Sequence, residues 1–173
     1  MARILVVYAS THGHTAKIAA RLAEAAGGAE VREVGAATDV LPRDYDVVVV
    51  GASVHGGSHQ DVVMHWAREH AAALNGMPSA FFSVCLAAAE DTEESCQATR
   101  DYIDNFLDDT GWTTRRTTTF AGALQYLEYD FMTRLAMRLL MKRGDHPTDV
   151  SHDYDYTDWE AVDSFGRDCA GLA

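Results

Sequence analysis

The sequence contains few cysteines and few prolines. Among 173 residues there are three of each, and the cysteines, Cys85, Cys96 and Cys169, form no CxxC pair. An odd number of widely spaced cysteines argues against a disulfide framework and against a zinc site. Free thiols suit a reducing compartment, so we expect a cytoplasmic protein and predict no metal site.

Long apolar runs are also missing. No segment approaches the roughly 20 apolar residues that a membrane-spanning helix requires. The apolar run Ile4–Tyr8 is too short to be the core of a signal peptide, and no cleavage site follows it. The sequence therefore predicts a soluble protein, and it leaves peripheral contact with the inner face of the cell membrane open.

Positive charge is scarce, and the net charge of the chain is −12. Such a chain repels phosphate backbones, so we expect no nucleic acid partner. The exception is the segment 131–143, where an amphipathic helix is predicted over Phe131–Lys142 and basic residues cluster at Arg134, Arg138, Lys142 and Arg143. This helix is interpreted either as a peripheral membrane contact or as a helix packed over the sheet with solvated arginines.

Apolar strands alternate with amphipathic helices along the chain. Strands are predicted at Ile4–Tyr8, Glu30–Val34, Asp46–Gly51, Ser79–Cys85 and Thr113–Ala123. Helices are predicted at Thr15–Ala26, Asp61–Leu74, Glu93–Asp109 and Asp158–Leu172. This alternation predicts an α/β fold in which helices cover both faces of an open parallel sheet. The length suits a single domain over residues 1–173, with an insert at about 125–155.

The loop after the first predicted strand indicates a phosphate site. It reads Ser10-Thr11-His12-Gly13-His14-Thr15 and opens a helix. Hydroxyl groups, a glycine and a helix N-terminus supply short donors, close backbone approach and a favourable dipole. The alternative is that Thr11 or His14 only caps the helix. The loop is not a Walker loop, because it lacks the required Gly-Lys-Ser/Thr. A receiver domain is excluded as well, since it would need a carboxylate at the end of the third strand, which here reads Gly51-Ala52-Ser53.

Several segments together carry a resemblance to a known family. The pattern Ser-Thr-x-Gly-x-Thr of residues 10–15 resembles the FMN phosphate loop of flavodoxins, and residues 51–57 resemble their second, ring-contacting loop. The segments 75–84, 121–126, 139–142 and 156–160 resemble the quinone-linked protoporphyrinogen oxidase branch of the flavodoxin superfamily. The resemblance covers essentially the whole chain.

This resemblance implies a flavodoxin-like three-layer α/β/α sandwich. Its sheet would have five parallel strands in the order 2-1-3-4-5, with a helical insert after the last strand. The cofactor would be non-covalent FMN, and the substrate protoporphyrinogen IX or another small redox molecule. Electrons would pass to membrane menaquinone or ubiquinone in heme biosynthesis. No catalytic side chain is predicted, because flavin chemistry needs none beyond the cofactor.

The resemblance also implies which residues hold FMN. The phosphate would bind to Ser10, Thr11, His12, Gly13, His14 and Thr15. The isoalloxazine ring would be bordered by Ser53, Val54, His55, Gly56, Gly57, Leu86, Ala87 and Ala88. Neither ring-contacting loop contains Trp, Tyr or Phe, so His55 and His59 are the side-chain rings on offer there.

Two other functions remain open. The first is a flavodoxin-like electron carrier or FMN-dependent quinone reductase without porphyrin activity. The acidic run 90–94 favours it by suiting a basic redox partner, although the same run suits a helix N-terminus. The second is an interaction module that has lost FMN, which the lack of aromatic residues in the ring-contacting loops favours.

Overall fold

Five parallel strands form the central sheet, in the order β2-β1-β3-β5-β6. They are β1 (Ile4–Tyr8), β2 (Glu30–Glu33), β3 (Val47–His55), β5 (Ser79–Cys85) and β6 (Arg116–Ala121). The short strand β4 (Ser58–His59) adds an antiparallel hairpin to β3. Numbered among the five long strands alone, this order is 2-1-3-4-5, so the predicted topology is confirmed.

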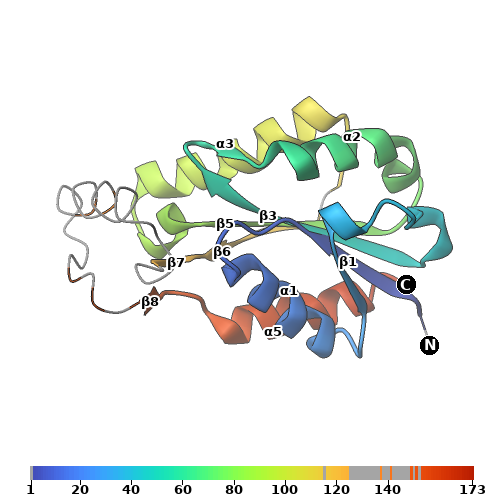
Figure 1. Ribbon diagram of the computed structural model, residues 1–173, viewed down its shortest axis with the longest axis horizontal. Coiled ribbons are helices and arrows are strands. Elements are labelled where there is room, and N and C mark those ends of the chain that lie inside the picture. Colours follow the sequence, from blue (N-terminus) through green and yellow to red (C-terminus); the bar gives the residue numbers. More distant parts are fainter. Residues whose placement is uncertain are drawn as a thin grey trace.

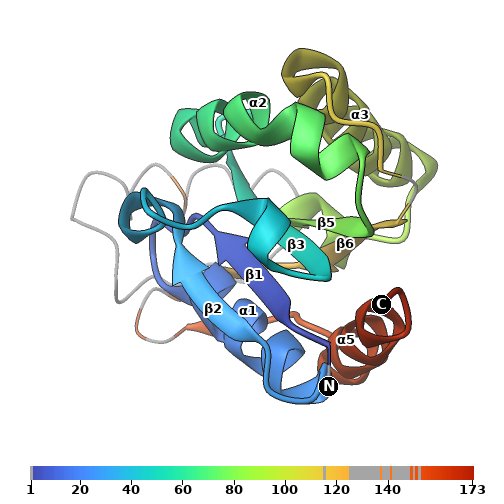
Figure 2. The ribbon, with the colours of Figure 1, turned by 90° about the vertical axis from the view of Figure 1, so that its right-hand side faces the viewer.

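Helices cover both faces of the sheet (Figure 1). One face carries α1 (His14–Ala25) and α5 (Trp159–Ala170), and the other carries α2 (Asp61–Asn75) and α3 (Glu93–Thr110). Figure 2 shows the same three layers after a quarter turn. Short 3-10 helices follow three of the strands or loops: η1 (Val34–Ala36), η2 (Pro42–Asp44) and η3 (Leu86–Ala89). The expected α/β/α sandwich is therefore confirmed.

The computed structural model describes residues 2–114, 116–124, 137, 141, 149, 151 and 153–173. Apart from Met137 and Met141, the residues of the helix predicted over Phe131–Lys142 lie outside the described residues, as does most of the predicted insert. The described ends of that segment meet, because β7 (Ala123–Leu124) pairs antiparallel with β8 (Tyr154–Asp155). Among the helices that the structure describes, none has the length and apolar character needed to cross a membrane.

The four consecutive valines of β3 join the two layers of the core. Val48 and Val50 pack on the side of α2 and α3, and Val47 and Val49 pack on the side of α1 and α5. All four side chains are fully buried. Because successive side chains of a strand point to opposite faces, a continuous apolar run is what a strand buried on both faces requires.

Gly166 allows α5 to approach α1 closely. A Cβ at this position would lie 2.6 Å from the carbonyl oxygen of Leu22 and 2.8 Å from the Cβ of Ala25. Any larger side chain would push the two helices apart, because backbone cannot yield as a flexible side chain can. The close packing holds α1, and with it the loop that precedes α1, against the sheet.

Strand β3 extends further than the sequence predicted, and it turns into a hairpin that the sequence did not predict. β3 was expected to end at Gly51, but it continues to His55, which pairs with Ser58. In the same hairpin Val54 pairs with His59. Residues 51–55 of the predicted ring-contacting loop 51–57 are therefore regular strand, with side chains in alternation.

The last long strand is shorter than predicted. It begins at Arg116, not at Thr113. The Thr113 N–H instead donates to the side-chain Oδ1 of Asn75 at 2.8 Å. The Asn75 side chain, at the end of α2, therefore accepts the hydrogen bond from a backbone N–H that a longer strand could have used in the sheet.

The hairpin buries His59, which the sequence had placed in the ring-contacting loop. Its Nε2 lies 2.9 Å from Ser83 Oγ, and its ring packs edge-on against Phe81 and Phe106 at centroid distances of 5.4 and 5.1 Å. Only 4% of the residue is exposed. The expectation that His59 offers its ring to a cofactor is wrong, because the aromatic cluster beneath the hairpin already holds it.

Burial of His59 predicts a specific dependence of stability on pH. Burial lowers its pKa from 6.5 to about 4, so the unfolded chain binds the proton more readily than the folded chain does. The free energy of unfolding should therefore fall as the pH drops from about 6.5 towards 4. This one group contributes about 2–3 kcal/mol of that loss.

Urea unfolding at pH 7.5 and 4.5 measures this effect. The His59→Gln variant keeps a polar group for Ser83 but cannot titrate, so it should lose less stability on acidification than the wild type. His65→Gln makes the same change at an exposed position and serves as the control. An equal loss of stability in the wild type and in His59→Gln would contradict the prediction.

Candidate functional site

The carboxyl ends of β1, β3, β5 and β6 surround a single hollow of about 390 Å³. In open parallel sheets this is the edge at which ligands bind, and the volume lies in the usual range for small-molecule sites. The loop residues that line it are Ser10, Thr11, His12, His14, Thr15, Ser53, Val54, His55, Gly56, Gly57, Leu86 and Ala87. The structure thus brings the three predicted segments together.

The first turn of α1 lies open at one end of the hollow. Gly13 precedes the helix in the left-handed region, at φ 83°, which favours glycine. Its N–H donates to Ser10 Oγ at 3.0 Å. Within the described part of the chain, no side chain caps the N-terminus of α1. The alternative that Thr11 or His14 caps the helix is therefore wrong, and the N–H groups of the first turn are left for a ligand.

The hollow differs in charge from the rest of the molecule. The chain has a net charge of −12, yet no Asp, Glu, Lys or Arg is among the described residues that line the hollow. Within the described lining, therefore, no carboxylate offsets the partial positive charge of the α1 N-terminus. An anionic group is favoured at this end of the hollow on electrostatic grounds.

Gln60 ties the first two loops together, and sequence reasoning missed it. Its Oε1 accepts from the Ser53 N–H at 3.1 Å, and its Nε2 donates to Ser53 Oγ at 2.7 Å. The same Nε2 donates to Thr11 Oγ1 at 3.3 Å. Gln60 follows directly after the hairpin, so its role depends on a register that the sequence alone did not reveal.

Two histidines lie side by side at the hollow. The rings of His12 and His55 meet edge to face, with centroids 5.8 Å apart, and His55 Nε2 lies 3.1 Å from Ser53 Oγ. Burial, and secondarily the neighbouring His12, lower the pKa of His55. His55 is therefore neutral at pH 7 and can present a polar ring without a charge.

The opposite wall of the hollow is apolar. Leu86 and Ala87, at the start of η3, line it, whereas Ala88 is not among the lining residues. Tyr102 of α3 and the methionines Met137 and Met141 also line it. Sequence reasoning missed all three, because no local pattern marks a helical tyrosine or a methionine as lining a pocket. The hollow therefore has a polar end at α1 and an apolar end beyond β5.

His14 contacts both the hollow and the C-terminal segment. It is the first residue of α1 and lines the hollow, and its buried side chain reaches the C-terminal segment, where Nε2 lies 2.7 Å from Thr157 Oγ1. Burial lowers the pKa of His14, although the carboxylate of Asp155 opposes that effect. The side chain is therefore directed away from the place that the sequence predicted, while the backbone of the residue remains at the open helix end.

The acidic run 90–94 leads into α3, which begins at Glu93. Thr92 Oγ1 accepts from the Ser95 N–H at 3.1 Å, and Glu93 and Glu94 occupy the first turn. Carboxylates at this place interact favourably with the helix dipole. The helix N-terminus accounts for Glu93 and Glu94 without a redox partner.

Replacing Gln60 tests the connection between the loops. The Gln60→Leu variant loses three hydrogen bonds and leaves the Ser53 N–H without its acceptor. We expect the free energy of unfolding to fall by about 1–3 kcal/mol. Gln97→Leu, which removes one exposed bond to Asp101, should change it by less than about 0.5 kcal/mol. Equal urea midpoints for Gln60→Leu and the wild type would rule out the connection.

Comparisons with known proteins show which family this chain belongs to. The protein-family model described as "Flavodoxin domain" matches residues 5–151 of this chain. Protoporphyrinogen IX dehydrogenase (quinone) of Escherichia coli K12 is 35% identical over 179 residues, which cover 98% of this chain and 96% of that protein. The protein of the same name from Leishmania major is 33% identical over 98% of this chain and 75% of its own length.

Solved structures agree on the fold. Oxidised Flavodoxin 1 from Bacillus cereus superposes with a TM-score of 0.56 at 15% identity, covering 99% of each chain. The flavodoxin of Streptococcus pneumoniae TIGR4 gives 0.54 at 21% identity, covering 99% of this chain and 100% of that one. At such identities the likeness shows the fold alone. The family match and the curated relatives carry the assignment further, and on their evidence the chain belongs to the flavodoxin domain family.

Proposed function

We propose that this flavodoxin-family oxidoreductase oxidises protoporphyrinogen IX and passes the electrons to a quinone, with FMN held in the hollow at the strand ends. The observation that carries the proposal is the 35% identity to protoporphyrinogen IX dehydrogenase (quinone) across 98% of the chain. That alignment includes the segment after β6, which contributes Met137 and Met141 to the hollow. The similarity therefore extends to residues that border the proposed site.

Membership of the flavodoxin family gives FMN as the cofactor, and the residues present fit it. The open first turn of α1 and the absence of carboxylates from the described lining suit the phosphate. The residues that would hold it are those of the predicted loop, Ser10, Thr11, His12, Gly13, His14 and Thr15. The hydroxyls of Ser10 and Thr11 supplement the backbone N–H groups, so no lysine is needed.

The flavin ring would lie between the β3–β4 hairpin and the start of η3. Its border would be Ser53, Val54, His55, Gly56, Gly57, Leu86, Ala87 and Ala88. Gly56 and Gly57 turn the hairpin at positive φ, 61° and 90°, so the chain can pass close to a flat ring. The neutral His55 offers a polar edge, and Tyr102 supplies the aromatic ring that the loops lack.

When bound, FMN accepts electron pairs from a reduced substrate and returns them to an oxidant. The protein supplies position and surroundings for that chemistry. Val54, Leu86 and Tyr102 exclude water from the apolar end, and Met137 and Met141 extend this surface towards the segment after β6. An apolar wall beside the cofactor suits the hydrocarbon part of a porphyrinogen macrocycle.

The quinone links the proposal to the membrane. Quinones are lipid-soluble, so an enzyme without a spanning helix would meet them at the bilayer surface. The basic segment 131–143 would supply that contact on the cytoplasmic side, where anionic lipids attract clustered arginines. The remainder of the chain, which is strongly acidic, would face away from the lipid.

Anaerobic turnover tests the proposed function. The protein loaded with FMN should convert protoporphyrinogen IX to fluorescent protoporphyrin IX in the presence of a menaquinone analogue, with quinol formed in proportion. Protein from which FMN has been removed serves as the control and should form neither product. If the FMN-loaded protein reduces the quinone with an artificial donor but leaves protoporphyrinogen IX unchanged, it is a quinone reductase or electron carrier and the porphyrin assignment is wrong.

A further inference from the structure

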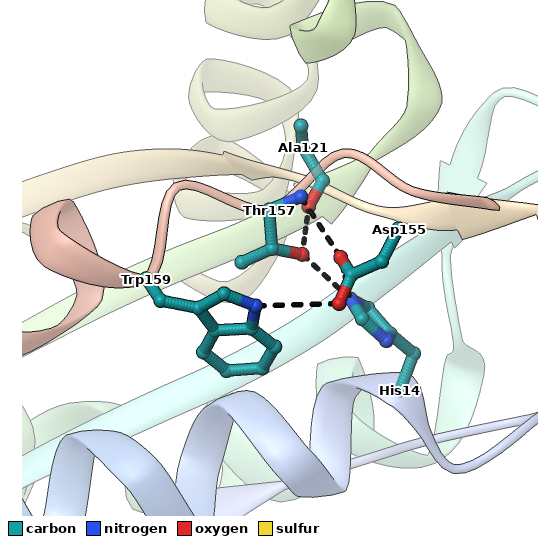
Figure 3. Close-up of polar contacts among 5 residues, drawn as sticks. All are labelled: His14, Ala121, Asp155, Thr157 and Trp159. Atoms are coloured by element: carbon teal, nitrogen blue, oxygen red, sulfur yellow. Dashed lines mark hydrogen bonds and ion pairs between the residues drawn. The ribbon is translucent and has the colours of Figure 1, made fainter.

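A cluster of polar contacts joins the start of α1 to the C-terminal segment (Figure 3). His14 Nε2 lies 2.7 Å from Thr157 Oγ1, and Thr157 Oγ1 donates to the carbonyl oxygen of Ala121 at 2.9 Å. Ala121 is the last residue of β6. Three segments far apart in the sequence thus meet at one hydroxyl group.

Asp155 holds the same segment from the other side. Its Oδ1 accepts from the Thr157 N–H at 2.9 Å, and its Oδ2 accepts from the indole N–H of Trp159 at 3.3 Å. The same carboxylate lies 3.6 Å from His14 Nε2. Partial burial would raise the pKa of Asp155, but the hydrogen bonds from Thr157 and Trp159 outweigh it and lower that pKa, so this residue is a charged acceptor at pH 7.

These contacts fix which nitrogen of His14 carries the proton. The Thr157 hydroxyl has one hydrogen, and it is used in the bond to Ala121. Thr157 Oγ1 must therefore accept from His14, so Nε2 carries a hydrogen. Because burial keeps the imidazole neutral, Nε2–H is then its single N–H group. A neutral ring with this proton placement points its donor at Thr157 and Asp155.

The cluster touches the proposed phosphate site at one residue. His14 lines the hollow, whereas Asp155, Thr157 and Trp159 are not among the described residues that line it. His14 is also the first helical residue, so its backbone N–H belongs to the open turn that faces an anion. The position of that N–H depends on the anchoring of the His14 side chain outside the hollow.

From this geometry we infer that Thr157 and Asp155 are positioning residues for a phosphate monoester bound at the N-terminus of α1, and that they act through the His14 side chain. The inference rests on the proposed binding of the FMN phosphate at this loop. An ordered first turn loses less conformational freedom on binding, so preorganisation by the cluster raises affinity without contact with the ligand. The gain in affinity is expected for the phosphate group and not for the flavin ring.

Riboflavin provides the matched probe, because it carries the flavin ring of FMN without the phosphate. The variant Thr157→Val keeps the shape of the side chain and removes the hydroxyl, and Thr157→Ser restores it. Thr110→Val is the control: Thr110, like Thr157, donates its hydroxyl to a backbone carbonyl, that of Phe106, but it lies at the far end of α3. Titration of the protein stripped of FMN gives the dissociation constants of FMN and riboflavin.

We expect Thr157→Val to weaken FMN binding about tenfold and to change riboflavin binding by less than about twofold. Thr157→Ser should recover most of the loss, and Thr110→Val should leave the FMN-to-riboflavin ratio at the wild-type value. In a His14→Ala background, Thr157→Val should have no further effect on that ratio, since its action passes through His14. Misfolding would weaken both flavins together, so the ratio separates positioning from loss of structure.

Two results would overturn the inference, and they can be told apart. If the wild type prefers FMN to riboflavin and Thr157→Val keeps that preference, the cluster does not position the phosphate turn. If the wild type binds the two flavins equally well, the phosphate does not bind at the α1 N-terminus, and the proposed cofactor geometry falls with the inference.

Discussion

The architecture depends on a strand that is buried on both faces. The four valines of β3 pack alternately into the two core layers, which fixes β3 at the centre of the sheet with β1 on one side and β5 on the other. Because the long strands are parallel, their carboxyl ends meet at one edge. The described loops of the proposed cofactor site are therefore collected at that edge, and the termini lie at the opposite end (Figure 1).

At this edge α1 and α2 both begin without a side-chain cap, and of these two starts that of α1 lines the hollow. The starts of α3 and α5 are satisfied by Thr92 and Asp158, whereas α1 begins after a glycine that offers no side chain. An unsatisfied helix start costs free energy unless water or a ligand occupies it. The uncapped start of α1 lowers stability, and the same unsatisfied N–H groups would favour the binding of an anion. Contacts elsewhere, including those of Gly166 and His14, keep the open turn in place.

The sequence predicted the features that depend on local pattern. Apolar runs located β1, β3 and β5, and the loop of residues 10–15 was recognised by its composition. The family resemblance supplied the strand order, which the structure confirms. The misses share a cause: Gln60, Tyr102 and Thr157 act through partners that are distant in sequence, so no window of residues contains the signal. For His59 the sequence suggested a site residue where there is none. Its ring packs against Phe81 and Phe106 and is therefore not available to a cofactor.

The central claim is that the open turn of α1 binds the phosphate of FMN. An NMR titration of the protein stripped of FMN, followed at the backbone amides, tests it most directly. The account predicts that FMN produces its largest shifts at the N–H groups of His14 and Thr15 and that riboflavin does not reproduce them. Shifts concentrated instead at the opposite end of the sheet, around the hollow bordered by Gly27 and Tyr45, with the α1 turn unchanged, would contradict it.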